Sequence, residues 1–166
     1  MKYQDLIDDT NYYKANCWSF FLDLQAWRRF QVNYPLTWTR LKFEENNFNF
    51  VPKVRGIYVF TIALETGLLP EHGYILYMGI TGDKSKATLQ SRYNQYVADY
   101  KKKKGRPKVY NFLERWKGDL YFSFVPIPDN RKSLSKLERN FLSAVIPPVN
   151  ERDITAHISS ARRAAF

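Results

Sequence analysis

Two tyrosines lie inside apolar, strand-like runs, and a glycine stands close to each of them. Tyr58 belongs to the run RGIYVF, and Tyr77 belongs to the run ILYMGIT. Side chains alternate along a strand, so the two phenols can lie on the same face of neighbouring strands. Gly56 and Gly79 would let a backbone or a ligand come close beside them. The pattern predicts two phenols on one accessible sheet face.

A carboxylate falls inside the apolar stripe of a predicted helix over residues 133–146. At helical spacing, Glu138 lies between the apolar positions of that stripe rather than opposite them. A carboxylate facing a core is costly unless it is paired or bound to a cation. Alternatively, Glu138 closes a capping box with Ser135, which requires the helix to begin at Ser135. The spacing alone leaves both interpretations open.

An arginine lies at the edge of the apolar face of another predicted helix, over residues 88–100. This residue is Arg92, next to the face that includes Leu89 and Tyr96. A guanidinium that leans toward a sheet can hold a phosphate in bidentate fashion. The alternative is a surface side chain whose charged end reaches solvent.

Phenols, a guanidinium and a carboxylate around one sheet face would suit phosphodiester hydrolysis. That reaction needs a base for the attacking water, a positive charge at the phosphate and stabilisation of the leaving oxygen. A metal ion held by a glutamate could supply the last of these.

Five sequence elements, taken in order, resemble the GIY-YIG nuclease family. They are GIY at 56–58, YMG at 77–79, Arg92 in LQSRYNQY, Glu138 in LERNFLSAVI and Asn150 in PPVN. The resemblance covers about Arg55 to Glu151. It implies a small three-stranded antiparallel sheet flanked by helices, and metal-dependent cleavage of nucleic-acid phosphodiester bonds.

The resemblance also implies a role for each matched residue. Tyr58 would be the general base or the phenol that orients the water, and Tyr77 would position the phosphate or the water. Arg92 would stabilise the charge on the phosphate. Glu138 would hold one Mg²⁺ or Mn²⁺ ion, and Asn150 would support the site. Tyr96 occupies a place where family members often have His, and Thr81 could add a hydroxyl. An ordinary phenol has a pKa near ~10. We expect Arg92 and a bound metal to favour the phenolate of Tyr58, so that activity rises with pH.

The net charge indicates a polyanionic partner. The chain has 26 Lys and Arg against 16 Asp and Glu, a formal charge of +10. Nucleic acid is the first expectation, DNA rather than RNA, and an anionic membrane surface is the second. A predicted basic loop over residues 101–108 contains Lys101, Lys102, Lys103, Lys104 and Arg106, which we predict to bind nucleic acid together with Gly79, Thr81 and Tyr96. The tyrosines around this loop could stack on bases, or could pack in the core at helical spacing.

Length and composition indicate one globular domain with an appendage. No apolar run approaches the ~20 residues of a membrane helix, and the first residues are acidic where a signal peptide is apolar. The single cysteine, Cys17, excludes an internal disulfide and a Cys-based zinc site. We therefore expect a cytoplasmic protein with no membrane partner.

The predicted organisation is an α+β fold in three segments. Residues 1–50 form an N-terminal extension, residues 51–152 the nuclease-like domain and residues 153–166 a tail. The extension is expected to hold one helix over 15–32, a short strand at 36–43 and a polar loop at 44–50. Trp18 and Trp27 are expected on a buried face that caps the sheet; alternatively, the Trp and Arg side chains of the stretch AWRRFQ could grip DNA. Three strands are predicted at 56–64, 74–81 and 120–127, and helices at 88–100, 109–116 and 133–146.

Two other functions fit the same sequence. The chain could be a nucleic-acid-binding module of this fold without catalysis, or a basic protein-interaction adaptor. Cutting both strands of a duplex would need a homodimer or two successive events.

Overall fold

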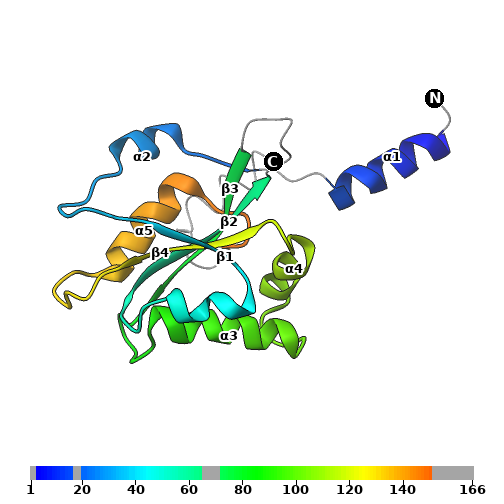
Figure 1. The fold of residues 1–166 in the computed structure, drawn as a ribbon. Coiled ribbons are helices and arrows are strands. Elements are labelled where there is room, and N and C mark those ends of the chain that lie inside the picture. The colour runs from blue at the N-terminus through cyan, green and yellow to red at the C-terminus, as the bar shows by residue number, and fades with distance from the viewer. Residues whose placement is uncertain (1–2, 17–19, 65–71, 151–166) are drawn as a thin grey trace.

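Helices and strands are interspersed along the chain in a mixed α+β arrangement (Figure 1). The computed structural model describes residues 3–16, 20–64 and 72–150. The strands are β1 (Thr39–Lys42), β2 (Gly56–Leu64), β3 (His72–Thr81) and β4 (Leu120–Pro126). The helices are α1 (Tyr3–Asn16), α2 (Leu24–Arg29), the 3-10 helix η1 (Glu45–Phe50), α3 (Leu89–Lys101), α4 (Pro107–Arg115) and α5 (Leu134–Val145).

One antiparallel sheet contains four strands, in the order β1-β4-β2-β3. The α+β class is therefore confirmed, but the expected sheet of three strands was wrong. The fourth strand is β1, whose Thr39 lies opposite Phe124 of β4. Without β1, the outer side of β4 would leave a row of backbone N–H and C=O groups unpaired. Because β1 is short and mostly exposed, its own sequence gives little sign of this pairing.

Helices cover both faces of the sheet. Ile57 and Val59 of β2 point toward the α5 side, where they pack with residues such as Leu137. Tyr58 and Phe60, the alternate residues, point toward α3 and α4. A strand buried on both faces gives a nearly continuous apolar run, which is what the sequence of β2 contains. The sheet therefore places its tyrosines in the layer formed with α3 and α4.

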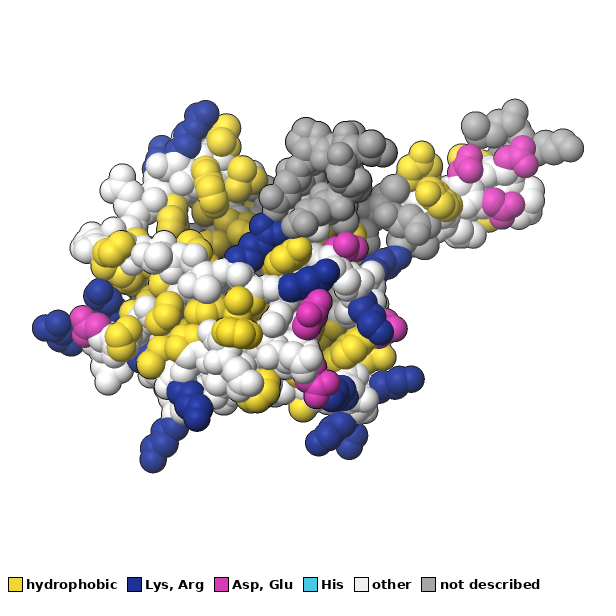
Figure 2. Space-filling view, in the orientation of Figure 1, with side chains coloured by type: hydrophobic (Ala, Val, Ile, Leu, Met, Phe, Trp, Pro, Cys, Tyr) yellow, Lys and Arg dark blue, Asp and Glu magenta, His cyan; other side chains and the backbone are white. Residues whose placement is uncertain are grey.

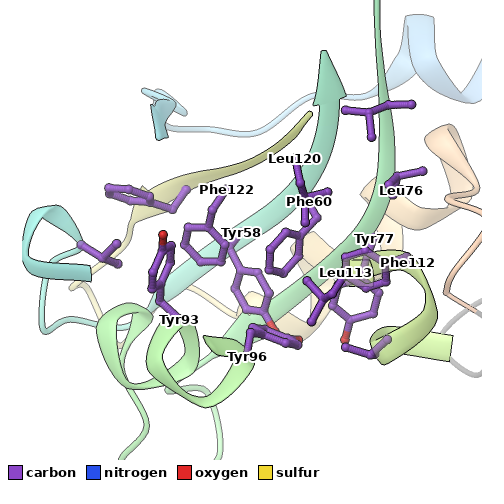
Figure 3. Close-up of a cluster of buried hydrophobic side chains, with 14 of the residues drawn as sticks. Tyr58, Phe60, Leu76, Tyr77, Tyr93, Tyr96, Phe112, Leu113, Leu120 and Phe122 are labelled. Carbon is purple, nitrogen blue, oxygen red and sulfur yellow. The ribbon is translucent and has the colours of Figure 1, made fainter. Parts of the chain in front are cut away.

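Aromatic rings fill the layer between the sheet, α3 and α4 (Figure 3). The ring centroid of Phe60 lies 5.0 Å from that of Tyr96 and 5.2 Å from that of Phe122. Edge-to-face pairs of this kind each contribute roughly 0.5–1.5 kcal/mol beyond their buried area. Tyr93 and Tyr96 are buried here, so these two tyrosines of α3 pack in the core and are not available to stack on bases.

The N-terminal segment differs from the expected single helix over 15–32. Residues 20–23 are not helical, and α2 begins after Asp23, whose Oδ1 accepts a hydrogen bond from the Ala26 N–H at 2.9 Å. The Asp23 N–H donates to the Ala144 carbonyl of α5 at 2.9 Å. This tertiary bond and the cap restart the helix at α2. Trp27 is 48% exposed, so its expected burial was wrong; Trp18 and Cys17 lie outside the described residues.

A 3-10 helix replaces the polar loop expected at 44–50. Tyr93 of α3 holds its start, since the Tyr93 hydroxyl donates to the Glu44 carbonyl at 2.6 Å and accepts from the Glu44 N–H at 3.0 Å. The predicted basic loop is shorter than expected because α4 begins at Pro107, a residue suited to the first helical position. The predicted tail, 153–166, lies outside the described residues.

Charged side chains are spread over the surface. On the face shown in Figure 2, Lys and Arg side chains project around the outline, and hydrophobic side chains occupy the centre. Within the described part of the chain, no helix has the length and apolarity that crossing a membrane requires.

Candidate active site

Side chains from both layers meet in one hollow beside strand β3. The hollow has a volume of about 360 Å³. Its lining includes Tyr58 of β2, Tyr77 and Gly79 of β3, Arg92 and Tyr96 of α3, Arg106 before α4, and Glu138 of α5. Because β3 is an outer strand of the sheet, α3 from one face and α5 from the other can both reach its edge. Four of the five predicted catalytic residues are brought together here, and Asn150 is not among the lining residues.

Tyr58 lies at the floor of the hollow and depends on a glycine opposite it. Gly79 pairs with Tyr58 across the β2–β3 ladder. A Cβ atom at residue 79 would lie 2.6 Å from Cζ of the Tyr58 ring, so only glycine leaves room for this phenol. The Tyr58 hydroxyl is 2.9 Å from the Tyr96 hydroxyl of α3, and Figure 3 shows the two phenols meeting between β2 and α3.

Tyr77 lies on the same sheet face as Tyr58, with ring centroids 6.3 Å apart. Its hydroxyl accepts a hydrogen bond from a terminal nitrogen of Arg106 at 2.8 Å. The Arg106 guanidinium also lies 5.4 Å from the centre of the Tyr77 ring. Arg106 was predicted only as part of a basic nucleic-acid-binding loop, but it is the second guanidinium of the hollow. The residue precedes α4, and its contact with β3 could not be inferred from local spacing.

Arg92 presents an unused hydrogen-bond donor within the protein. One of its terminal nitrogens donates to Oε1 of Gln95, one turn further along α3, at 2.7 Å. Its Nε is buried and has no hydrogen-bond partner in the described structure. A buried donor without a partner is costly, and an anionic oxygen bound in the hollow would satisfy it.

The start of α5 decides between the two interpretations of Glu138. The N-cap is Ser133, whose hydroxyl accepts from the Lys136 N–H at 3.2 Å. Helix α5 therefore does not begin at Ser135, and the capping box that would have engaged Glu138 does not form. Glu138 is half-buried and lines the hollow instead.

An ion pair that the sequence reading missed anchors the start of α5. Asp83, in the loop after β3, accepts from the Leu134 and Ser135 N–H groups at 3.2 Å each, and from the Ser135 hydroxyl. Arg55, before β2, donates to Oδ1 of Asp83 at 2.9 Å. The same terminal nitrogen also donates to the Lys132 carbonyl, and the other two nitrogens of Arg55 donate to the carbonyls of Gly82 and Asp129. The pair thus fixes the β3–α3 loop and the β4–α5 loop, and with them the helix that carries Glu138.

Asn150 acts on the outer side of β3 rather than inside the hollow. Its Oδ1 accepts from the Met78 N–H and its Nδ2 donates to the Met78 carbonyl, both at 2.8 Å. The Val149 N–H adds a bond to the Leu76 carbonyl at 3.1 Å. Asn150 thereby pairs an otherwise open strand edge next to Tyr77, which is a supporting role.

The other predicted nucleic-acid-binding residues do not enter the hollow. The exposed side chains are Lys101, Lys102, Lys103 and Lys104. Lys101 forms an ion pair with Glu45 of η1. Thr81 is buried, and its hydroxyl lies 3.5 Å from the Thr88 carbonyl. Gly79, Tyr96 and Arg106 are the members of this predicted set that line the hollow.

Burial keeps the two facing phenols protonated. Desolvation, followed by the neighbouring Tyr96 and Tyr77, raises the pKa of Tyr58 well above its ordinary value of 10.0. Desolvation likewise raises the pKa of Tyr96 strongly. Arg92 lowers the pKa of Tyr58, but this is the smallest of the named effects. The expected stabilisation of the Tyr58 phenolate by Arg92 therefore does not prevail, and Tyr58 is a neutral phenol that can donate or accept a hydrogen bond.

A divalent ion would find two carboxylates in the lining of the hollow, Glu138 of α5 and Asp99 of α3. The described residues contain no group of three or more His, Cys, Asp or Glu side chains placed to hold a metal. Mg²⁺ keeps several waters and is commonly bound by one or two carboxylates together with substrate phosphates. Glu138 therefore fits a Mg²⁺ or Mn²⁺ ion that shares its coordination with a bound phosphate, and does not fit a cage built only from protein ligands.

No family model, curated protein or solved structure matches this chain.

Proposed function

We propose that this chain is a metal-dependent endonuclease of the GIY-YIG type, which hydrolyses phosphodiester bonds of nucleic acid, with DNA as the expected substrate. The observation that carries the proposal is the composition of the hollow beside β3. Phenols, two guanidinium groups and two carboxylates, Asp99 and Glu138, line it, and they come from β2, β3, α3, α5 and the residue before α4.

Arg92 would bind a non-bridging oxygen of the scissile phosphate. The support is its buried Nε, which has no partner in the described part of the protein. Arg106 holds the Tyr77 hydroxyl at 2.8 Å and would place that phenol against the same phosphate. Two cations around one phosphate oppose the charge that develops as the bond to the leaving oxygen breaks.

Tyr58 and Tyr96 would act as neutral phenols that orient the attacking water. Their hydroxyls are 2.9 Å apart, and burial raises the pKa of Tyr58 well above its ordinary value. Tyr58 can accept a hydrogen bond from the water while Tyr96 donates to Tyr58. This favours the orienting role of Tyr58 over the role of general base.

Glu138 would hold the divalent ion, Mg²⁺ or Mn²⁺, at the edge of the hollow. When bound, such an ion lowers the pKa of coordinated water and neutralises charge on phosphate oxygens. The Arg55–Asp83 pair keeps α5, and so Glu138, in register with the strands that carry the phenols.

A mixed library of end-labelled DNA and RNA tests the proposal. The library is incubated with Mg²⁺ or Mn²⁺ and the wild-type protein, and the product ends are sequenced; a parallel reaction uses Glu138→Gln. We expect metal-dependent cuts by the wild type that disappear in the variant, and the DNA and RNA arms identify the substrate. Salt-sensitive binding without cleavage would favour the binding module instead. Absence of any binding would favour the protein-interaction adaptor.

A further inference from the structure

We propose that a second groove, between the segment after α2 and the start of α5, binds the nucleic-acid strand that extends from the scissile phosphate. This inference deepens the proposed function and rests on nucleic acid being the partner. The groove has a volume of about 450 Å³. It is lined by Gln31, Val32, Asn33, Tyr34, Arg131, Lys132, Ser133, Lys136, Leu137 and Asn140.

The groove is built from two segments far apart in the sequence. In Figure 1, the chain between α2 and β1 passes in front of α5. The Phe30 and Phe141 rings, 5.7 Å apart, hold this segment against the helix. At the groove itself, Nζ of Lys132 lies 3.9 Å from the centre of the Tyr34 ring. The N-terminal segment therefore forms one wall of a defined groove in addition to covering the sheet.

The charge of the lining favours an anion. Three of the lining residues, Arg131, Lys132 and Lys136, are cationic, and none is a carboxylate. Asp129, outside the lining, accepts two hydrogen bonds from the Arg131 guanidinium and partly neutralises its charge. Lys132 and Lys136 therefore carry the attraction for a phosphate backbone.

Another pocket of the protein has a mixed charge at its rim. A more apolar pocket of about 340 Å³ lies between β1, α3 and α4. Its rim has Lys42, Lys101 and Lys117, but also Glu44 and Glu45. Glu45 is already paired with Lys101. That pocket is therefore electrostatically mixed, whereas the groove beside α5 is cationic.

Three amide side chains give the groove a means of reading bases. Gln31, Asn33 and Asn140 line it, and none of their side chains has a hydrogen-bond partner within the described residues. Asn and Gln amides can form two hydrogen bonds with the edge of an adenine base. Such contacts distinguish one base from another, which phosphate contacts do not. Cations for the backbone together with free amides for base edges fit a nucleic-acid strand better than free phosphate.

Helix α5 connects the groove to the hollow. Lys136 and Asn140 line the groove, and Glu138 lines the hollow. At about 1.5 Å rise per residue, these three positions lie within little more than one helical turn of one another along the axis. A strand whose phosphate lies at Glu138 and which continues around α5 would enter the groove.

The binding test uses a catalytically disabled background, so that its result does not depend on cleavage. Lys132→Gln/Lys136→Gln is made in Glu138→Gln protein, and affinity for a fluorescent DNA duplex is measured from low to high salt. Neutralising two phosphate contacts should lower affinity about tenfold or more and reduce the salt slope by roughly 2. The matched control, Lys53→Gln/Lys117→Gln, removes the same charge elsewhere. It should change the affinity for DNA and the salt slope far less.

The amides are tested by sequence preference. Asn33→Ala/Asn140→Ala should alter which sequences are preferred in a selection from random oligonucleotides while leaving the salt slope unchanged. The groove proposal is overturned if the lysine pair and its control behave alike, or if an acidic peptide binds the groove and DNA does not. Binding without cleavage by the wild type would refute the nuclease alone, because the groove is still judged by affinity.

Discussion

The hydroxyl oxygens of Tyr58 and Tyr96 lie 2.9 Å apart, on a strand and a helix that the chain brings together across the aromatic core. This contact joins the floor of the hollow to the helix that carries Arg92. It is possible only because Gly79, across the strand pair, has no side chain. The geometry of the candidate site therefore depends on a packing relationship as much as on the reactive groups.

Gly79→Ala should damage both stability and activity through one steric contact. The added methyl would collide with the Tyr58 ring, and overpacking of this kind typically costs about 1–3 kcal/mol. Urea denaturation measures the stability of Gly79→Ala, Tyr58→Leu and the double variant. Because the smaller side chain relieves the collision, we expect the two effects to be coupled by about 1 kcal/mol or more. Strictly additive effects would contradict the assigned contact.

Arg92 and Arg106 should contribute differently to cleavage. Arg92→Lys loses the planar guanidinium and the buried Nε, so kcat should fall by about 10²–10³-fold. Arg106→Gln leaves the phosphate with one cation and loosens Tyr77, and a loss of about tenfold in kcat is expected from misplacement. Steady-state kinetics on one DNA substrate measures both, and exposed Arg28→Gln on α2 serves as the control. An unchanged kcat for Arg92→Lys would remove Arg92 from the site.

The Arg55–Asp83 pair should be among the most sensitive points for stability. The two side chains are largely buried, at 9% and 16% exposure. Arg55→Met would leave Asp83 without its cation, and breaking a buried pair in this way costs about 3–5 kcal/mol. Chemical denaturation gives the free energy of unfolding. The exposed pair of Arg131 with Asp129 is a matched comparison, since Arg131→Met should cost less than about 1 kcal/mol.

Asp83 should also make stability depend on acid pH. Hydrogen bonds from the Ser135 hydroxyl and from the Leu134 and Ser135 N–H groups hold the pKa of Asp83 below its ordinary value of 3.8. A carboxyl whose pKa is lowered in the folded state stabilises the protein at pH values above its ordinary pKa. This contribution is lost as the pH falls below that ordinary pKa. The melting temperature of the wild type should therefore drop more steeply with acidification than that of Asp83→Asn. Parallel curves would contradict the assignment.

Tyr93 should produce the opposite dependence in alkali. Burial raises the pKa of Tyr93 to about 12 from an ordinary value of 10.0. The folded state therefore favours the neutral phenol, so this contribution is complete below pH 10 and is lost as pH rises toward 12. Tyr93→Phe lacks this pH-dependent contribution. At neutral pH its free energy of unfolding should be about 1–2 kcal/mol lower, because the hydrogen bonds to Glu44 are lost. Thermal melts from pH 8 to pH 11 should show a steeper fall for the wild type.

Periodicity indicated part of the candidate site. Alternation along the strands allowed Tyr58 and Tyr77 to share one face, and the helical stripe allowed Glu138 to point inward. These predictions depend on local geometry that a strand or helix imposes on neighbouring residues. The choice between a site residue and a capping box at Glu138 required the helix start, which Ser133 and Asp83 set together.

Contacts between distant segments could not be predicted in the same way. The pairing of β1 with β4 depends on an open strand edge about 80 residues away in the chain. The Arg106–Tyr77 and Arg55–Asp83 contacts likewise join separate elements through long side chains. The break before α2 follows from a backbone bond between Asp23 and Ala144, which competes with local helix propensity.

The role of Glu138 is the central claim, and single-turnover cleavage tests it most directly. Glu138→Gln preserves size and hydrogen bonding but removes the charge that would hold the divalent ion. The control is Glu114→Gln, an exposed position on α4 outside the hollow. The reaction uses saturating enzyme, end-labelled DNA and Mg²⁺. We predict that Glu138→Gln cleaves at least about 10³-fold more slowly than the wild type, while its Kd for DNA changes little. Glu114→Gln should cleave at the wild-type rate. Cleavage by Glu138→Gln at the wild-type rate would contradict the account.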